Sequence, residues 1–453
     1  MKFDAHTLAL ACKGILIQTT TLPLQGSICT DTRNIKEGDW FLAIAGERFD
    51  GHNFIEKAKE LGAAGVIGQH VPEKWDRGFV QVEDSIVALQ NAARYTRQKF
   101  SGRVIAITGS AGKTTTRALV ASVLQKKWNI LETHGNFNNH IGLPLTILRS
   151  TLSEDVWILE LGMNHLGEIH LLQEIAQPHI RVITNVGAAH LEGVGDIDGV
   201  AKAKGEIFDG AKEDDLCLIN ADDVRICALN LPEKTRSKTF GFQGDFVRII
   251  KAHIDVTQLH TVIEMETPKG SITSAIPSPG LHLASNVAIA VAIGCTLQCS
   301  LKEISEGIAQ YQPVGARLRV EEGPRNTLLL NDAYNANPLS TKASLKTLSA
   351  LQPHTRFALL GDMLELGKES LAEHCDVLKF ALSLNLEGIG VCGKDFLRAA
   401  QQLDSPPPSL FFAENATLLG KQLLPKLKGK EILLLKGSRG SKMETLLSVL
   451  EEK

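Results

Sequence analysis

A glycine-rich segment near residue 110 has the composition of a phosphate-binding loop. It follows the apolar run 104–108 and reads Thr108-Gly109-Ser110-Ala111-Gly112-Lys113-Thr114-Thr115. A turn between a strand and a helix points backbone N–H groups at an anion, and the start of the helix favours negative charge. In such a loop Lys113 reaches the β- and γ-phosphates of a nucleotide, and the Thr114 hydroxyl holds Mg²⁺. We therefore predict an ATP-binding loop, with a simple strand-to-helix turn as the alternative.

The spacing of this loop is shorter than the usual phosphate-loop pattern. Position 107, five residues before Gly112, is Ile where that pattern has its first Gly. The segment is instead of the form T-G-x-x-G-K-T. The combination of Gly, Lys and Thr directly after an apolar strand still favours phosphate binding.

Two polar residues follow later apolar runs and are candidates for the same site. Glu160 closes the run 156–160, and His190 follows the run 180–184. Because the carboxyl ends of parallel strands form the ligand edge of such a sheet, Glu160 is a candidate second Mg²⁺ ligand. The alternatives are a solvated acid at a strand end and a hydrogen-bonded loop histidine. The asparagine cluster 136–139 is either a turn or part of the site.

The pattern around the loop predicts a parallel sheet in the segment 101–312. The apolar runs 104–108, 156–160, 180–184 and 216–220 alternate with helical segments, as in a doubly wound fold. Between 245 and 275 the apolar period approaches two, and Lys269-Gly270 supplies a turn. We expect an antiparallel hairpin there, added to the parallel sheet. An alanine-rich helix should follow at 285–293.

The segments on either side are predicted to be smaller α/β domains. In residues 1–100, strands are expected at 40–44 and 65–68, with a helix over 54–61 that ends at Gly62. In residues 313–453, strands are expected at 327–331, 357–361, 388–392 and 432–436, with helices between them. The last segment should form a second, Rossmann-like sheet.

The composition of the chain argues against a nucleic-acid-binding, membrane or secreted protein. The chain has 453 residues, 43% of them hydrophobic and 22% charged, and a net charge of −3. This balance gives no reason to expect nucleic acid or an anionic membrane as a partner. The eight cysteines contain no C-x-x-C pair, and Cys295 and Cys299 are expected as buried thiols on one helix. With neither a signal peptide nor 18 consecutive apolar residues, a cytoplasmic protein is expected.

Several segments together resemble the Mur ligases, and the resemblance covers nearly the whole chain. The segments 30–33, 41–43 and 46–52 are similar to the uridine-nucleotide domain of that family. Its central domain is similar to the phosphate loop, to 136–139, 160–163, 189–192 and 201–207, and to 280–282 with Asn286, whereas Leu283 departs from the usual Asn of the family. The segments 331–338, 361–367 and 436–439 resemble the members that add D-alanyl-D-alanine, and differ from those that add meso-diaminopimelate or lysine.

The resemblance implies three α/β domains and a role for each matching residue. The ATP phosphates would be held by Gly109, Ser110, Ala111, Gly112, Lys113, Thr114 and Thr115. Asn286 and Asn335 would contact the adenine, Asp332 the ribose and Arg317 the γ-phosphate. Thr114 and Glu160 would hold one Mg²⁺, and His190 would help to hold a second. Lys204 aligns with a lysine that is carbamylated in this superfamily, and Lys202 is the alternative candidate for carbamylation. Catalysis would rest on Lys113, His190, Lys204 and Arg317, and the substrate would lie near Thr32, Arg33, Asn138 and Asn139.

The implied reaction joins D-alanyl-D-alanine to a UDP-N-acetylmuramoyl-tripeptide through an acyl phosphate made from ATP. A monomer is expected, without nucleic acid or membrane insertion. The alternatives are a folylpolyglutamate-synthetase-like ligase, an ATP-dependent kinase or motor, and a non-catalytic nucleotide-binding regulator. The sequence leaves open whether the tripeptide ends in meso-diaminopimelate or lysine, and no residue stands out as the base for the incoming amine.

Overall fold

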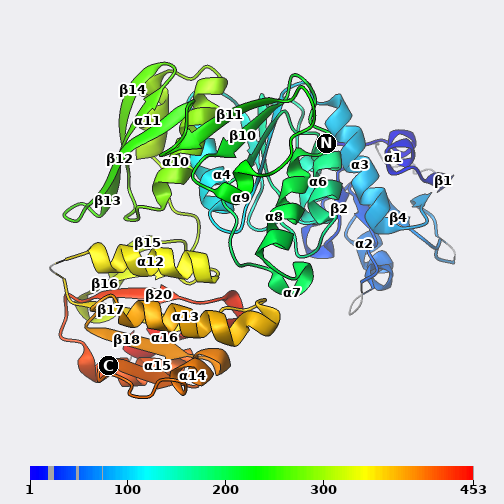
Figure 1. Cartoon of the computed structure of the whole chain (residues 1–453). Helices are drawn as coiled ribbons and strands as arrows, with labels where there is room; N and C mark the ends of the chain where they lie inside the picture. The colour runs from blue at the N-terminus through cyan, green and yellow to red at the C-terminus, as the bar shows by residue number, and fades with distance from the viewer. Residues whose placement is uncertain (19–24, 47–49, 74, 353, 452–453) are drawn as a thin grey trace. The chain divides into compact units, whose positions relative to one another are not determined.

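The computed structural model of the chain contains three separate sheets with helices around them (Figure 1). It describes residues 1–18, 25–46, 50–73, 75–352 and 354–451. Part of the family-like segment 46–52, namely residues 47–49, therefore lies outside the described residues. The strands of the three sheets lie within 15–81, 103–276 and 319–436, so the predicted three-part α/β fold is confirmed.

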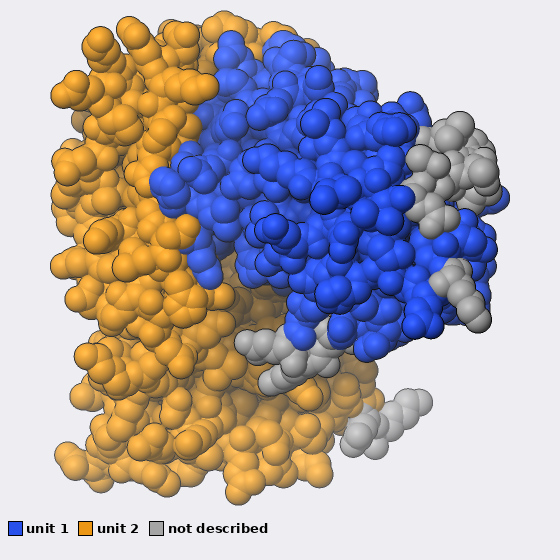
Figure 2. All heavy atoms as spheres, turned by 90° about the vertical axis from the view of Figure 1, so that its right-hand side faces the viewer, with its two compact units in different colours: residues 1–106, 128–162, 168–180 blue, residues 107–127, 163–167, 181–453 orange. Residues whose placement is uncertain are grey.

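Two compact units make up the chain, shown in blue and orange in Figure 2. Unit 1 comprises residues 1–106, 128–162 and 168–180; unit 2 comprises residues 107–127, 163–167 and 181–453. Unit 1 contains the first sheet, in which the strand order is β1-β5-β4-β3-β2. Its elements are α1 (Ala5–Cys12), β1 (Ile15–Gln18), β2 (Ile28–Cys29), β3 (Trp40–Leu42), α2 (Ile55–Glu60), β4 (Gly65–Gly68), β5 (Gly78–Gln81) and α3 (Ser85–Lys99).

The small first sheet is held by apolar residues on both faces. β2, β3, β4 and β5 run parallel, and β1 pairs with β5 in the antiparallel sense. Trp40 and Leu42 pack with α1 and α3 on one face, whereas Phe41 packs with Ile55 on the other. Because successive strand residues point to opposite faces, this alternation explains why the short run Trp40-Phe41-Leu42 is apolar throughout.

The second sheet has nine strands in the order β14-β13-β12-β11-β10-β9-β6-β8-β7. Strands β6 and β9 contribute residues to both units. The strands are β6 (Arg103–Thr108), β7 (Ile130–Glu132), β8 (Val156–Glu160), β9 (Ile180–Ile183), β10 (Leu216–Asn220), β11 (Arg236–Gly241), β12 (Val247–Asp255), β13 (His260–Thr267) and β14 (Gly270–Ile276). Strand β8 is fully buried, as a continuous apolar run predicts.

The antiparallel part of this sheet is larger than one hairpin. β12, β13 and β14 form a three-stranded meander, and the predicted turn at Lys269-Gly270 joins its last two strands. The prediction missed β12 as a full partner because its alternation breaks after Ile249, where Ile250 and Lys251 are both exposed and the pairing with β13 shifts register. The following helix, α10 (Leu283–Thr296), is buried along almost its whole length.

The cysteine prediction needs one correction. Cys295 lies on α10, but the helix ends at Thr296, so Cys299 is a buried thiol beyond it rather than on it. All eight cysteines are free thiols.

The third sheet lies in unit 2 and has the order β15-β16-β20-β17-β18-β19. β15 is antiparallel to β16 and the remaining neighbours are parallel. The sequence patterns identified four of these strands and missed the edge strands β15 and β19. The elements are β15 (Arg319–Gly323), β16 (Thr327–Asp332), α12 (Pro338–Ala350), β17 (Arg356–Gly361), α13 (Ser370–Leu382), β18 (Gly388–Cys392), α14 (Lys394–Ala400), β19 (Leu410–Ala413), α15 (Ala416–Leu423), β20 (Ile432–Lys436) and α16 (Thr445–Glu451).

Across the described ranges, no helix combines the length and the apolar character that a membrane crossing requires.

Candidate active site

The predicted phosphate loop connects β6 to helix α4 (Lys113–Leu124). Gly109 and Gly112 have φ angles of 149° and 81°, which a residue with a side chain adopts only under strain. A Cβ atom at position 109 would also lie 1.9 Å from Thr184 Oγ1. Both glycines are therefore required by the backbone path, which supports the interpretation of this segment as a specialised loop.

The loop is fastened to the segment that follows β9. Asn185 accepts a hydrogen bond from Ala111 N at 2.9 Å through its side-chain oxygen, and its amide donates to Ala111 O at 3.0 Å. The Thr184 hydroxyl donates to the same carbonyl at 2.6 Å, and Ser110 Oγ donates to Gly187 O at 2.9 Å. Thr184 and Asn185 thus hold the loop in shape. Sequence analysis did not assign them a role, although both precede the candidate His190.

The loop's functional side chains surround the start of α4. Lys113 Nζ donates to Gly109 O at 2.7 Å, so the ammonium group folds back over its own loop. Thr114 lies in the first turn of α4 and is only 3% exposed. Asn286, predicted to contact adenine, instead donates from Nδ2 to Gly112 O at 3.4 Å. It lies against the loop, and its contact with a base stays a prediction.

His190 lies beside a carboxylate that the sequence analysis did not single out. Its Nδ1 atom is 2.7 Å from Glu365 Oε2. Both residues have left-handed backbones, with φ of 56° and 66°. The hydrogen bond from His190 lowers the pKa of Glu365, and the positive charge of Lys113 acts in the same direction. The contact therefore pairs the imidazole with an ionised carboxylate.

The two candidate lysines on helix α8 (Ile197–Gly205) differ sharply in environment. Lys202 is exposed, whereas Lys204 is 1% exposed. Burial lowers the pKa of Lys204 well below its usual range, and the nearby charge of Lys113 adds to this effect. A neutral amine is the form that reacts with carbon dioxide, so Lys204 is the better candidate for carbamylation.

Three further predicted residues lie in unit 1. Glu160 is 2% exposed, and Asn138 Nδ2 donates to its Oε1 atom at 2.8 Å. Asn139 Oδ1 accepts from Gly142 N, at the first residue of helix α5 (Gly142–Leu148), at 2.8 Å. Asn138 therefore positions the candidate metal ligand, whereas Asn139 holds the local turn, and the contact of Asn139 with a substrate stays a prediction.

Thr32 and Arg33 form a short 3₁₀ turn in unit 1, Thr32–Asn34, that Asp31 caps. The guanidinium of Arg33 pairs with Asp31, with Nη2 to Oδ2 at 2.6 Å, and its side chain is 86% exposed. An exposed arginine of this kind is accessible to an anionic ligand.

Asp332 forms contacts that the sequence did not suggest. Its Oδ2 atom lies 2.6 Å from Lys436 Nζ and accepts from the Ser344 hydroxyl at 2.6 Å, while Oδ1 accepts from Leu318 N at 3.0 Å. Lys436 is 3% exposed and also donates to Asn335 O at 3.0 Å. The carboxylate thus ties β16 to β20 and to the segment before β15, and its contact with a ribose stays a prediction.

Arg317 stacks on an aromatic ring. Its guanidinium carbon lies 3.9 Å from the centre of the Tyr334 ring. The buried Nε atom of Arg317 takes no hydrogen-bond partner in the described part of the chain. A stacked guanidinium keeps its edge available for an anion. This geometry fits the predicted role of Arg317 as a phosphate-binding residue.

A pocket of about 190 Å³ brings several of these residues together within unit 2. Asn337 contributes to it by donating from Nδ2 to the Ser110 carbonyl at 3.1 Å. The lining residues are Ser110, Lys113, Ala189, His190, Asn335, Ala336, Asn337, Leu364, Glu365, Ser438, Arg439 and Gly440. This one cavity therefore contains the candidate phosphate-binding lysine, the candidate histidine and residues from the domain of the third sheet.

The candidate metal ligands have suitable chemistry. A buried carboxylate and a buried hydroxyl are the oxygen donors that Mg²⁺ prefers, and Glu160 and Thr114 supply them. Across residues 1–18, 25–46, 50–73, 75–352 and 354–451, no group of three His, Cys, Asp or Glu side chains is close enough to hold a metal by itself.

The fold and the site define an ATP-dependent ligase class, and family profiles agree. The Mur ligase family catalytic domain matches residues 26–97, the Mur ligase middle domain matches 107–294, and the Mur ligase glutamate ligase domain matches 316–439. The chain belongs to the Mur ligase family.

Within this family, the chain is similar to ligases that add D-alanyl-D-alanine. The UDP-N-acetylmuramoyl-tripeptide–D-alanyl-D-alanine ligase of Escherichia coli strain K12 is 36% identical over 430 residues, which is 94% of each chain. A crystal structure of MurF from Acinetobacter baumannii superposes with a TM-score of 0.92 at 31% identity, covering 100% of this chain and 99% of that one. MurF from Thermotoga maritima in complex with ADP gives a TM-score of 0.84 at 28% identity, covering 94% and 97%.

Proposed function

We propose that this chain is a cytoplasmic, ATP-dependent ligase that joins D-alanyl-D-alanine to UDP-N-acetylmuramoyl-tripeptide. The observation that carries the proposal is similarity along 94% of the chain to a relative of that name, together with the pocket around Lys113. The ADP complex of the Thermotoga relative supports ATP as the nucleotide. The proposal includes domains at 1–100, 101–312 and 313–453, and a monomer without nucleic acid or membrane insertion.

The reaction must activate a carboxylate before an amine can attack it in water. The terminal carboxylate of the tripeptide attacks the γ-phosphorus of ATP, and the bond to ADP breaks. The dipeptide amine, having lost a proton, then attacks the acyl carbon of the acyl phosphate, and inorganic phosphate leaves. Two anions must approach each other in the first step, so the chain must supply positioning and positive charge.

Each predicted residue has a place in this scheme. Lys113 and the amides of residues 109–115 bind the phosphates, with Asn286, Asp332 and Asn335 toward the nucleoside. Arg317, stacked on Tyr334, neutralises the γ-phosphate. Thr32, Arg33, Asn138 and Asn139 lie toward the UDP-tripeptide. Lys204, as a carbamate, would supply a further carboxylate.

Mg²⁺ is the metal that these donors would accept. Thr114 and Glu160 would hold one ion and His190 would help to hold a second. When bound, the ions neutralise charge on the phosphates.

A phosphate-release assay tests this function. We expect turnover that requires ATP, the UDP-tripeptide and D-alanyl-D-alanine together. Release that continues without the dipeptide, or that requires glutamate instead, would contradict the proposal. Comparing UDP-tripeptides that end in meso-diaminopimelate and in lysine would identify the third residue.

A further inference from the structure

The pocket described above contains a single carboxylate. Among its lining residues, Lys113 and Arg439 are cationic and Glu365 is the sole acid. The proposed reaction brings two kinds of reactant together. The phosphates and the carboxylate of the tripeptide are negatively charged and are bound by cations. The amine arrives as an ammonium ion and is bound by an anion.

Glu365 is accessible from the pocket. Its side chain is 59% exposed, and His190 occupies only its Oε2 atom. The described residues supply no hydrogen-bond partner to the other oxygen, Oε1. One oxygen is thus fixed by the protein while the second can accept a hydrogen bond from a ligand.

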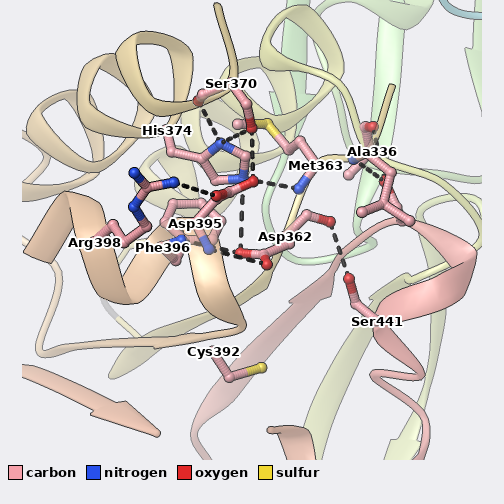
Figure 3. A network of polar contacts seen from close by, with 12 residues as sticks. Ala336, Asp362, Met363, Ser370, His374, Cys392, Asp395, Phe396, Arg398 and Ser441 are labelled. Atoms are coloured by element: carbon pink, nitrogen blue, oxygen red, sulfur yellow. Dashed lines mark hydrogen bonds and ion pairs between the residues drawn. The ribbon is translucent and has the colours of Figure 1, made fainter. Parts of the chain in front are cut away.

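A buried network determines where Glu365 lies (Figure 3). The Asp362 side chain accepts from Phe396 N at 2.9 Å and from Asp395 N at 3.1 Å, which ties β17's end to the start of α14. Met363 N donates to Nε2 of the fully buried His374 at 2.9 Å. Figure 3 shows the His374 ring between Ser370 and Met363.

The segment is held from a second side as well. Ser438 Oγ accepts from Leu364 N at 2.9 Å, and Ser438 N and Ser441 Oγ each donate to Asp362 O at 3.0 Å. The backbone of residues 362–364 is therefore fixed on both sides. Glu365 follows directly in a left-handed conformation, and its contact with His190 holds the carboxylate at the pocket.

Arg439 lines the same pocket and completes a pair of opposite charges. Its side chain is 74% exposed, and the one ion pair that it forms with the described residues, to Glu444 at 3.8 Å, is long. Leu364, 48% exposed, lies in the same lining. A small zwitterion with an apolar middle has this sequence of groups: ammonium, methyl-bearing backbone and carboxylate.

On the basis of the function proposed above, we propose that Glu365 and Arg439 form the subsite for the incoming dipeptide. Glu365 binds its ammonium group through Oε1, and Arg439 binds its carboxylate. Leu364 provides the apolar surface between them. The subsite would place the amine in the same cavity as Lys113.

Steady-state kinetics with the full chain tests the ammonium half. Glu365→Gln keeps the shape and removes the charge. It should raise the KM for D-alanyl-D-alanine by roughly 10- to 100-fold, as expected for loss of a hydrogen bond between charged groups, and leave the KM for ATP unchanged. Glu369→Gln, an exposed acid four residues away, is the matched control and should behave as wild type.

Acyl-phosphate formation, measured without dipeptide by reductive trapping, separates this role from a structural one. If Glu365→Gln forms the acyl phosphate at the wild-type level, the defect lies in amine binding. If it loses acyl-phosphate formation, Glu365 acts through His190 and the proposal is wrong. An unchanged dipeptide KM would also overturn it. Failure of the wild-type chain to make product would instead refute the underlying ligase function.

A comparison of two acceptors tests whether Arg439 binds the carboxylate of the dipeptide. Wild type should prefer D-alanyl-D-alanine to D-alanyl-D-alaninamide, which lacks the terminal charge, by about tenfold or more. Arg439→Ala should use the two acceptors equally well. A preference that survives in Arg439→Ala would remove Arg439 from the subsite.

Discussion

Asn337 Nδ2 donates a hydrogen bond to the carbonyl oxygen of Ser110 at 3.1 Å, and so links the start of α12 to the phosphate loop. The same side chain caps α12, because Asn337 Oδ1 accepts from Ser340 N at 2.8 Å. One buried amide thus holds both a helix start in the third sheet's domain and the backbone of the candidate phosphate loop.

The two roles of Asn337 can be separated by substitution. Asn337→Ala should lower the free energy of unfolding by about 2 kcal/mol, since a cap and a buried hydrogen bond are each worth about 1 kcal/mol. Asn337→Ser keeps a capping oxygen and should recover about half of that loss. Both variants should raise the KM for ATP. Chemical denaturation and ATP kinetics measure these effects, and equal stability of the two variants would contradict the capping role.

The local part of the site could be predicted from sequence. A strand, two glycines that need positive φ, and a helix that begins at Lys113 are all encoded within residues 103–124, so their pattern is visible without the fold. The same holds for Glu160, which closes a fully buried strand. Each of these features depends on neighbours in the chain.

The contacts that shape the site from a distance could not be predicted in this way. Asn337 and Ser110 are 227 positions apart. Glu365 and His190 meet only because the 362–364 backbone is fixed by His374 and Ser438. Asp332, whose contact with a ligand stays a prediction, also binds Lys436, Ser344 and Leu318, and no local pattern reveals such partners.

Removing the phosphate-loop cation should abolish most activity. Lys113→Ala and His190→Ala should each reduce kcat by about 100- to 1000-fold, the range for one oriented electrostatic donor. The exposed Lys421→Ala is a control for loss of one positive charge. Near wild-type phosphate release in either pocket variant would refute the assignments.

Lys204 should lower the stability of the folded chain and yet be required for activity. Because burial lowers its pKa, the unfolded chain binds a proton at this residue at pH values where the folded chain does not. The free energy of unfolding therefore rises with pH up to the ordinary lysine pKa of about 10.4, and falls as pH drops toward the lowered pKa. Lys204→Met should flatten this slope, raise stability near neutral pH and abolish ligation.

The exposed Lys202→Met is the matched control for that experiment. It should change neither the pH slope nor the activity by much. The measurement is denaturation at several pH values without added carbon dioxide, alongside activity with bicarbonate present. A Lys202→Met chain that loses activity while Lys204→Met keeps it would exchange the two assignments.

Arg317 and Tyr334 should act as a stacked pair in nucleotide binding. Tyr334→Phe keeps the ring under the guanidinium and should retain wild-type KM for ATP. Tyr334→Ala removes it and should raise that KM by roughly 3- to 10-fold, the range expected for a partly exposed cation–π contact. Arg317→Lys keeps the charge but loses the planar guanidinium, so it should be more damaging than Tyr334→Ala and should lower kcat as well. If Arg317→Lys matched wild type in both parameters, charge alone would suffice at this position, and the stacking geometry would have no part in holding the γ-phosphate.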